Sequence, residues 1–416
     1  MKKVAVVGAG IAGLTSARLL VGEGYQVKVF ERETKPGGLI QCKRVAGSLF
    51  HICGGHVFNT KNEDVANWFW SIFDKDRDFV KADRRSAVCM ADGRFVDYPI
   101  ENHIYQLDAG VQRKVISDWI GVASKVSQSS NFDSFLRARF GTTLYNLYFE
   151  PYNRKVWGRS LSDVPLGWLE GKLPMPTVEE MLFANFNHVK EKSFVHSSFF
   201  YPKNNGSQFL ADTIANGLDI VYGRSIGFIR RGKSGKLEVN GESFDHVVFC
   251  GNLKDLPSIL EGFGIDGFSY EIEKLESHGT TAVFCETDKI PYSWFYQPSI
   301  KHQSHRFICT GNFSKTNNAS GKMTCTIEFT DKIEEHDIKS QLSIMPFHPK
   351  YLTHHFSPYT YPIQHSETRK MISTLKEKLS SSGIFLVGRF AEWEYYNMDA
   401  AIASAKERCQ LICRGM

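Results

Sequence analysis

The feature that most constrains this chain is a glycine-rich turn between an apolar strand and a helix at its N-terminus. Residues 4–31 read VAVVGAGIAGL, TSARLLVGEGY and QVKVFE, which predicts strand, turn, helix and second strand in one βαβ unit. Gly8 suits a tight turn, Gly10 lets the backbone approach a pyrophosphate, and Gly13 lets the helix pack closely on the strand. The N-terminus of the predicted helix then faces the phosphates with its positive dipole end.

An acidic residue closes the second strand of this unit. Glu31 lies about 20 residues after the turn, where a carboxylate accepts the hydroxyl groups of a ribose. Strand, turn, helix and acid together predict a dinucleotide-binding Rossmann domain. The GxGxxG pattern recurs once, as GFGIDG from Gly262, but no apolar strand like that of residues 4–7 precedes it. We therefore expect no second dinucleotide domain, which argues against an ordinary pyridine-nucleotide disulfide reductase, since such enzymes carry two.

The residues after Glu31 separate two kinds of dinucleotide. In the run ERETKPGG, four residues separate Arg32 from a second glycine turn at Gly37 and Gly38. This spacing resembles the RxxxxGG extension of the flavin-binding family that includes amine oxidases, protoporphyrinogen oxidase and UDP-galactopyranose mutase. The resemblance implies FAD. The plain alternative is a surface loop that carries a glycine pair by chance.

Composition argues against several other classes of protein. The chain has 416 residues, of which 42% are hydrophobic, so it can bury a large core. Its formal net charge is +5, and its basic residues are scattered among acidic ones, which gives no support for a nucleic-acid partner. The nine cysteines form no CxxC pair, which favours reduced thiols. Since no apolar run approaches the roughly 18 residues that span a membrane, we expect a cytoplasmic protein without an integral membrane segment.

Strand and helix signals indicate an α/β fold in which an inserted helical domain and an antiparallel β-sheet domain join the Rossmann domain. Helical periodicity covers residues 61–75 and 108–150, whereas strand and turn signals return at 219–250 and 279–330. The run IFLVGRF at 384–390 is interpreted as a strand that rejoins the first sheet. The predicted boundaries are residues 1–60, 200–265 and 365–416 for a discontinuous FAD-binding domain, 61–80 and 105–195 for the helical domain, and 81–104 and 266–364 for the β-sheet substrate domain.

Five further segments resemble the UDP-galactopyranose mutase family. The first is GGHVF from Gly54, similar to the family's GGH or GPH loop, whose histidine is here His56. The second is YPIENHIYQL from Tyr98, which places Asn102 at the asparagine of a YPxxN segment. The third is EPYNRKVWGRSLSDVPLGWLEGK, where PYNRKVW matches a PYNxKVW core that ends at Trp157.

The last two segments lie in the C-terminal half. HRFICTGNFS from His305 is similar to the YRxTxFSNYS strand of the eukaryotic mutases and aligns Arg306 with its arginine. GRFAEWEYYNMDAAI from Gly388 resembles the GRxxxYxYxxMD ending, and Tyr361 before Pro362 resembles a further tyrosine of the family. Because five matches occur in the family's order, the set is much more specific than any one of its members.

The resemblance implies roles for individual residues. The catalytic residues that it implies are His56, Arg306 and Arg389. Its substrate-binding residues are Tyr98, Asn102, Trp157, Lys172, Arg306, Tyr361 and Tyr395. Its cofactor-binding residues are Gly8, Gly10, Gly13, Glu31, Arg32, Gly37, Gly38, Gly55, His56, Gly388, Arg389, Asn397 and Met398. No metal site is expected, because the sequence has no metal-ligand cluster.

Two departures from the family pattern concern the substrate. Lys172 stands where the family has an arginine that faces the diphosphate, and Trp393 stands where it often has tyrosine. A lysine offers a point charge in place of a planar fork, so the substrate pose and the sugar are left open. The residues also have plain structural alternatives: His56 as a hydrogen-bonded residue of a buried turn, Arg306 as a solvated strand residue, and the tyrosines as core aromatics.

The function implied by the resemblance is an FAD-dependent isomerase that interconverts the pyranose and furanose forms of UDP-galactose or a related UDP-hexose. FAD would be bound non-covalently and act when reduced, through an adduct between N5 and the sugar, with an external reductant such as NAD(P)H. The product would serve a galactofuranose-type polysaccharide pathway, and a homodimer is one assembly left open. Two other functions remain: a flavin oxidase or desaturase of the same superfamily, and a catalytically silent FAD-binding protein of a polysaccharide pathway.

Overall fold

A parallel five-stranded sheet forms the centre of the first lobe in this computed structural model, which describes residues 1–123, 129–166, 176–189, 198–365 and 367–415. The strand order is β20-β13-β1-β2-β9, and every neighbouring pair is parallel. Its strands come from three distant parts of the chain: β1 (Lys3–Val7), β2 (Gln26–Phe30), β9 (Ile220–Val221), β13 (His246–Phe249) and β20 (Ile384–Leu386). The short apolar strands suit burial on both faces, as parallel sheets require.

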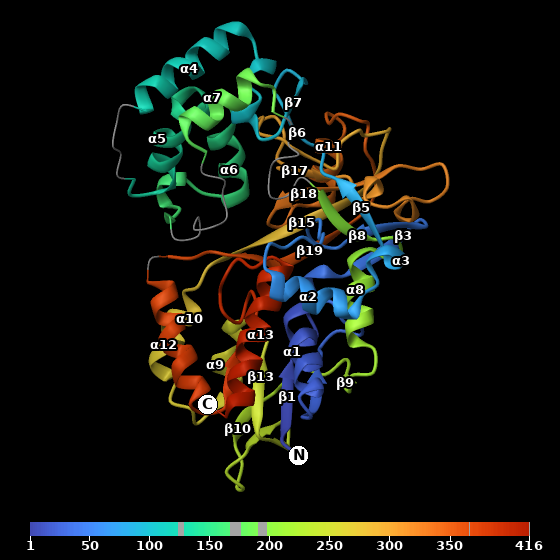
Figure 1. Cartoon of the computed structure of the whole chain (residues 1–416), viewed down its shortest axis with the longest axis vertical. Helices are drawn as coiled ribbons and strands as arrows, with labels where there is room; N and C mark the ends of the chain where they lie inside the picture. Colours follow the sequence, from blue (N-terminus) through green and yellow to red (C-terminus); the bar gives the residue numbers. More distant parts are fainter. Residues whose placement is uncertain (124–128, 167–175, 190–197, 366, 416) are drawn as a thin grey trace.

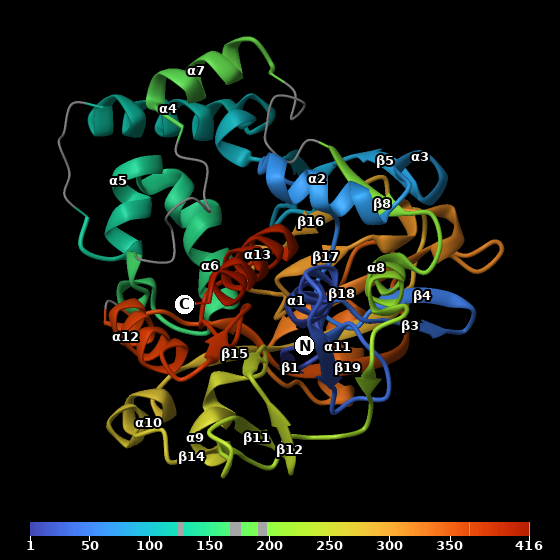
Figure 2. The same cartoon turned by 60° about the horizontal axis from the view of Figure 1, so that its bottom comes forward.

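Helices cover one face of this sheet. The contacting pair α1 and α13 runs beside the strands in both views (Figure 1 and Figure 2). Apolar side chains of the sheet and of these helices form one buried cluster that includes Val4, Leu14 and Ile402. The helices that contribute to the cluster are α1 (Ile11–Gly22), α2 (Glu63–Ile72), α8 (Gly206–Ala215) and α13 (Met398–Arg414).

The other face of the sheet packs on a second apolar cluster, which includes Ala5, Phe249 and Trp393. Its helices are α9 (Leu256–Ile259), α10 (Asp266–Glu273) and α12 (Thr368–Ser380). A small sheet of order β12-β11-β10-β14 closes this side, with β10 (Ile229–Arg231), β11 (Leu237–Val239), β12 (Glu242–Phe244) and β14 (Leu260–Glu261).

A seven-stranded sheet of order β19-β15-β18-β17-β16-β6-β7 forms the second lobe. It is antiparallel except for one parallel pair, β16 with β6, and α11 (Glu335–Leu342) packs against it. The strands are β6 (Ser86–Cys89), β7 (Phe95–Asp97), β15 (Ser277–Glu286), β16 (Trp294–Tyr296), β17 (Arg306–Ile308), β18 (Thr324–Thr330) and β19 (Lys350–Pro362). Two antiparallel two-stranded sheets accompany it. One pairs β3 (Cys42–Val45) with β4 (Ser48–His51), and the other pairs β5 (Phe79–Asp83), which follows α3 (Lys75–Asp78), with the distant β8 (Ser198–Pro202).

A third group consists of helices and lies apart from the parallel sheet, at the upper left of Figure 1. Trp119, Phe132 and Tyr145 are among the residues buried between these helices. The group comprises α4 (Ala109–Ala123), α5 (Phe132–Leu144), a π-helical turn (Tyr145–Phe149), α6 (Glu150–Trp157) and α7 (Val178–Phe186).

The predicted α/β class with a Rossmann-type sheet is confirmed, and residues 384–386 rejoin that sheet as expected. One assignment differs. Residues 61–80 are predicted to belong to the helical domain, but Val65, Phe69 and Phe73 are buried in the cluster that α1 and α13 cover. The amphipathic pattern of α2 predicts that it buries one face but does not say against which partner. No helix in the described ranges has the length and apolar character needed to cross a membrane.

Candidate functional site

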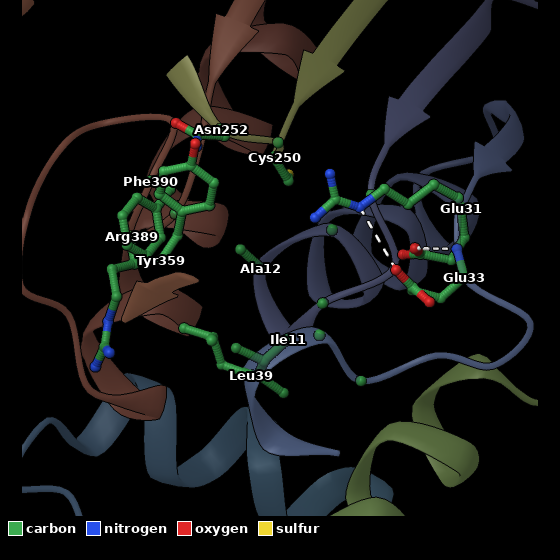
Figure 3. A pocket seen from close by; sticks show the side chains of 18 of the residues that line it. Ile11, Ala12, Glu31, Glu33, Leu39, Cys250, Asn252, Tyr359, Arg389 and Phe390 are labelled. Atoms are coloured by element: carbon green, nitrogen blue, oxygen red, sulfur yellow. Dashed lines mark hydrogen bonds and ion pairs between the residues drawn. The ribbon is translucent and has the colours of Figure 1, made fainter. Parts of the chain in front are cut away.

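A cavity of about 800 Å³ opens at the carboxyl ends of β1 and β2 and at the start of α1. Figure 3 shows Glu31 and Glu33 on one side of it, and Tyr359, Arg389 and Phe390 on the opposite side, with Ile11 and Leu39 between them. Residues from the first glycine turn, the second glycine turn and the C-terminal segment all line this cavity. It therefore occupies the position where open α/β sheets bind dinucleotides.

The three glycines of the first turn differ in their surroundings. Gly8 has a φ of +98°, a conformation that favours glycine. A Cβ on Gly13 would lie 1.9 Å from the carbonyl oxygen of Gly8, so α1 packs on β1 only because Gly13 has no side chain. A Cβ on Gly10 would meet no atom within 4 Å. Gly10 lines the cavity, and its open side leaves room for a ligand to approach the backbone.

The carboxylate of Glu31 is held by the backbone around the cavity. It accepts hydrogen bonds from the backbone N–H of Ala9 at 2.6 Å and of Glu33 at 2.9 Å. The side chain is buried, lines the cavity and keeps further lone pairs for a donor such as a ribose hydroxyl. Arg32 also lines the cavity, and its Nε lies 3.7 Å from Oε1 of Glu33.

The second glycine turn lies directly on the first. The backbone N–H of Gly37 donates to the carbonyl oxygen of Ala9 at 2.8 Å. A Cβ on Gly38 would lie 3.3 Å from Cα of Gly10. The two turns therefore form one backbone surface at the mouth of β1, and Gly37 and Gly38 both line the cavity.

The C-terminal motif closes the cavity from the other side. Gly388 has a φ of +98°, and a Cβ there would lie 2.7 Å from Cβ of Ala12. Arg389 donates from Nε to the carbonyl oxygen of Tyr396 and from Nη1 to that of Thr360, each at 2.9 Å. Its guanidinium thus holds the turn together. Asn397 begins α13 without a side-chain cap, and Asn397 and Met398 both line the cavity.

A second cavity of about 220 Å³ adjoins the first, and His56, Asn397 and Met398 line both. Two arginines line the smaller cavity, Arg84 and Arg306. Its full lining is Gly55, His56, Val57, Asn59, Arg84, Phe199, Trp294, Tyr296, Arg306, Asn397, Met398 and Asp399. A ligand in the smaller cavity would therefore meet a ligand in the larger one at His56.

His56 is neutral at this junction. Burial and the nearby Arg389 charge lower the pKa of its imidazole to about 4. Its Nε2 is buried and has no hydrogen-bond partner among the described residues. A buried polar nitrogen without a partner is unfavourable, so the position of this imidazole costs the fold some stability. The backbone N–H of His56 donates to Nδ1 of His51 at 3.3 Å, which anchors the turn.

Arg306 belongs to a row of four side chains beside the cavities. Its Nη2 donates to the hydroxyl of Tyr361 at 3.3 Å. Tyr361 stacks on Tyr395 with ring centroids 5.4 Å apart, and the Arg389 guanidinium lies 4.8 Å from the centroid of the Tyr395 ring. The structure therefore brings together Arg306, Tyr361, Tyr395 and Arg389, which come from three distant segments of the sequence.

The other predicted substrate-binding residues in the described part of the chain are packed against neighbouring side chains. Tyr98 packs against Tyr296, 4.8 Å between ring centroids, Asn102 is buried, and Trp157 is buried among the helices α4 to α7. Like Tyr361 and Tyr395, these three residues line neither cavity. Lys172 lies outside the described residues.

Sequence reasoning missed two polar residues at the site. Arg84 donates from Nη2 to the hydroxyl of Tyr296 at 2.8 Å inside the smaller cavity. Glu328 is almost fully buried and pairs with Arg306. A signal for Glu328 exists in the sequence, because it interrupts the buried run TCTIEFT with a lone charge.

Fold and cavities together define a Rossmann-type dinucleotide-binding protein with a second site joined to the nucleotide site. A family profile described as an NAD(P)-binding Rossmann-like domain matches residues 6–75. The chain is 24% identical to dTDP-fucopyranose mutase of Escherichia coli, covering 99% of this chain and 98% of that protein. It is 25% identical to the probable UDP-galactopyranose mutase of Klebsiella pneumoniae, covering 97% and 93%.

The fold also matches a solved structure. The crystal structure of reduced UDP-galactopyranose mutase superimposes with a TM-score of 0.88 at 20% identity, covering 100% of this chain and 96% of that one. The resemblance to the UDP-galactopyranose mutase family that five sequence segments carried is confirmed by these nearly full-length relatives. A flavin cofactor is implied by the same findings.

Proposed function

We propose that this chain is an FAD-dependent nucleotide-sugar mutase that interconverts the pyranose and furanose forms of a UDP-sugar. The observation that carries the proposal is the junction at His56, where a dinucleotide-type cavity meets a smaller cavity lined by Arg84 and Arg306. A mutase needs this arrangement, because the sugar carbon must reach the cofactor while its diphosphate stays bound. Nearly full-length similarity to named sugar mutases supports the same reading.

The larger cavity fits non-covalent FAD. Gly8, Gly10 and Gly13 with the start of α1 would hold the pyrophosphate, and Glu31 would accept the ribose hydroxyls. The start of α13, a helix of 17 residues, adds backbone N–H groups near Asn397. His56, which lines both cavities, would lie beside the group bound at the junction. When bound and reduced, the flavin supplies a nucleophilic nitrogen for the sugar carbon.

Side chains of the protein would stabilise the charge that develops during this reaction. Arg306 and Tyr361 would donate to the diphosphate, whose negative charge grows when the bond to the sugar breaks. His56 would stay neutral, since its lowered pKa of about 4 keeps it unprotonated at pH 7. A neutral imidazole adds no positive charge beside the anomeric carbon, so it positions and polarises its neighbours.

Three further assignments belong to this proposal. An external reductant such as NAD(P)H keeps the flavin reduced, Lys172 is a weaker diphosphate partner than an arginine, and the protein works in the cytoplasm, with a homodimer as one assembly left open. The sugar is galactose or a related hexose. The relatives carry either UDP or dTDP in their names, so both nucleotides belong in the substrate panel.

The experiment is an anaerobic panel assay. Dithionite-reduced protein is incubated with UDP- and dTDP-hexoses, and each mixture is separated to look for an isomer of altered retention. An isomer formed only by the reduced protein supports the proposal. Oxygen consumption with substrate turnover would favour a flavin oxidase, and nucleotide-sugar binding without turnover would favour a catalytically silent protein.

A further inference from the structure

The carboxylate of Glu328 connects the two parts of the site. Glu328 on β18 lies directly opposite Arg306 on β17, and its Oε2 accepts from Nε of Arg306 at 2.8 Å. Its other oxygen, Oε1, accepts from the backbone N–H of Gly54 at 2.9 Å. Gly54 begins the turn that carries His56. One side chain therefore contacts both the arginine of the smaller cavity and the turn of the cavity junction.

This carboxylate is a charged group that the protein keeps away from water. Its side chain is 1% exposed, whereas the side chain of Arg306 is 20% exposed. Burial by itself would raise the pKa of Glu328, but the Arg306 guanidinium and the neighbouring His305 outweigh it and lower the pKa to about 2. His305 lies with Nε2 at 3.6 Å from Oε2. Glu328 is therefore ionised at every pH at which the protein is expected to work.

The pairing leaves one edge of the Arg306 guanidinium facing the cavity. Nε and Nη2 donate hydrogen bonds to Glu328, and Nη2 also donates to Tyr361. Nη1 makes no hydrogen bond within the described residues. A guanidinium fixed along one edge presents its remaining N–H groups in a defined direction. Such fixed donors bind an anion better than a freely rotating side chain does, because less conformational freedom is lost on binding.

We propose that Glu328 is a positioning residue, which aims Arg306 at a phosphate group in the smaller cavity and holds the His56 turn in the matching place. This inference about Glu328 depends on the proposed function only for the identity of the ligand, a nucleoside diphosphate. Glu328 itself lines neither cavity and acts through Arg306 and Gly54.

The test measures UDP affinity of the oxidised FAD-bound protein by calorimetry, which requires no turnover. We expect Glu328→Gln to weaken UDP binding by about tenfold, the lower end of the loss seen when a carboxylate that orients a metal-binding side chain is removed. Glu328→Asp keeps the charge but is one methylene too short to hold both partners, so UDP binding stays weakened there too. The matched control is Glu334→Gln, which removes an exposed carboxylate.

A double-mutant cycle separates positioning from general damage. If Glu328 acts through Arg306, then Glu328→Gln causes no further weakening in an Arg306→Ala background. Equal weakening in both backgrounds overturns the proposal. Tighter UDP binding by Glu328→Gln, or full affinity in Glu328→Asp, also overturns it, because each means that Glu328 only balances charge. If Glu328→Gln alone does not fold, Glu328→Asp replaces it in the cycle, because that variant keeps the charge beside Arg306 and is also expected to bind UDP more weakly.

Two further readouts keep this inference apart from the proposed function. Displacement of the His56 turn is expected to shift the flavin absorption bands of Glu328→Gln, and an unchanged spectrum contradicts the second half of the proposal. If the wild-type protein turns over no nucleotide sugar but the cycle shows coupling, the mutase assignment fails and the positioning role stands. If the wild-type protein turns over a nucleotide sugar but the cycle shows that the two residues act independently, the mutase assignment stands and the positioning role fails.

Discussion

Gly13 packs so tightly against Gly8 that a Cβ on Gly13 would lie 1.9 Å from the Gly8 carbonyl oxygen, whereas Gly10 between them faces open space. A substitution at Gly13 therefore tests folding, whereas a substitution at Gly10 tests cofactor binding. We expect Gly13→Ala to force α1 off β1 and to lower the melting temperature sharply or prevent folding. Gly10→Ala places its methyl group toward the cavity and is expected to keep the fold but lose FAD. Circular dichroism melts and the 450 nm absorbance of the purified proteins check both, and a yellow Gly10→Ala protein with full FAD content contradicts the placement of the pyrophosphate.

Arg306 provides the second prediction. We expect Arg306→Ala to weaken UDP binding by about tenfold to hundredfold while FAD stays bound, because a charge-assisted contact contributes roughly 1.5 to 3 kcal/mol. Titration calorimetry measures the change, and Arg230→Ala, which removes an exposed arginine paired with Glu238, is the control. Unchanged UDP affinity would place Arg306 outside the binding site.

The third prediction concerns Glu392, which is buried beneath the C-terminal turn. It accepts from the backbone N–H of Gly388 at 2.8 Å and from Lys376 and Ser404, so it joins α12 and α13 to the cofactor cavity. Glu392→Ala leaves Lys376 without this partner and is expected to lower the free energy of unfolding by about 3 to 5 kcal/mol, with weaker FAD binding. Glu394→Ala breaks the more exposed pair with Arg369 and should lower it by less than about 1 kcal/mol. Similar losses in chemical denaturation of the two variants would argue against this role.

Acid sensitivity is the fourth prediction. Burial, with smaller effects from neighbouring charges, lowers the pKa of His51 to about 3 and that of His56 to about 4, both from an ordinary 6.5. Below pH 6.5 the unfolded chain binds protons that the folded chain does not, so stability falls as pH decreases and levels off near these folded-state values. Each histidine contributes a slope of about 1.4 kcal/mol per pH unit between roughly pH 6 and 4. Glu328 has a pKa of about 2 in the folded protein, below the ordinary glutamate value of 4.5. It adds a further loss of stability that begins only when the pH falls below that ordinary value.

The measurement for this prediction is the free energy of unfolding between pH 7 and pH 4.5. His51→Gln should reduce the slope by the equivalent of one proton. His336→Gln is the matched control, because His336 is largely exposed. An identical slope in His51→Gln and the wild type would mean that His51 titrates normally in the folded protein.

The sequence predicted that the glycine turns and Glu31 would lie together, and they line the larger cavity, because the features that bring them together are local. The turn of Gly8, Gly10 and Gly13 and the acid at Glu31 act within one βαβ unit, where spacing alone fixes which groups meet. The return of β20 to the sheet was also readable, since a short apolar run beside a glycine is typical of a buried parallel strand.

The rest depends on tertiary packing that no spacing encodes. Glu328 meets Arg306 only through the register of β17 with β18, and it meets Gly54 only through the packing of a distant turn. Arg389 was predicted as a catalytic residue, yet its guanidinium is bonded to two backbone carbonyl oxygens, so its contribution to charge at the site stays a prediction. Similarly, the apolar face of α2 could be recognised while its partner could not.

The most direct test of the central claim is the dependence of turnover on the oxidation state of the flavin. A mutase starts and ends each cycle with reduced flavin, so one anaerobic reduction should support many turnovers of a UDP-sugar, and oxidised protein should be inactive. The assay counts isomerised sugar per flavin before and after reduction, with the absorbance at 450 nm followed throughout. The account predicts many products per flavin and no change in absorbance during turnover. Turnover by the oxidised protein, with one flavin bleached for each substrate consumed, would contradict it.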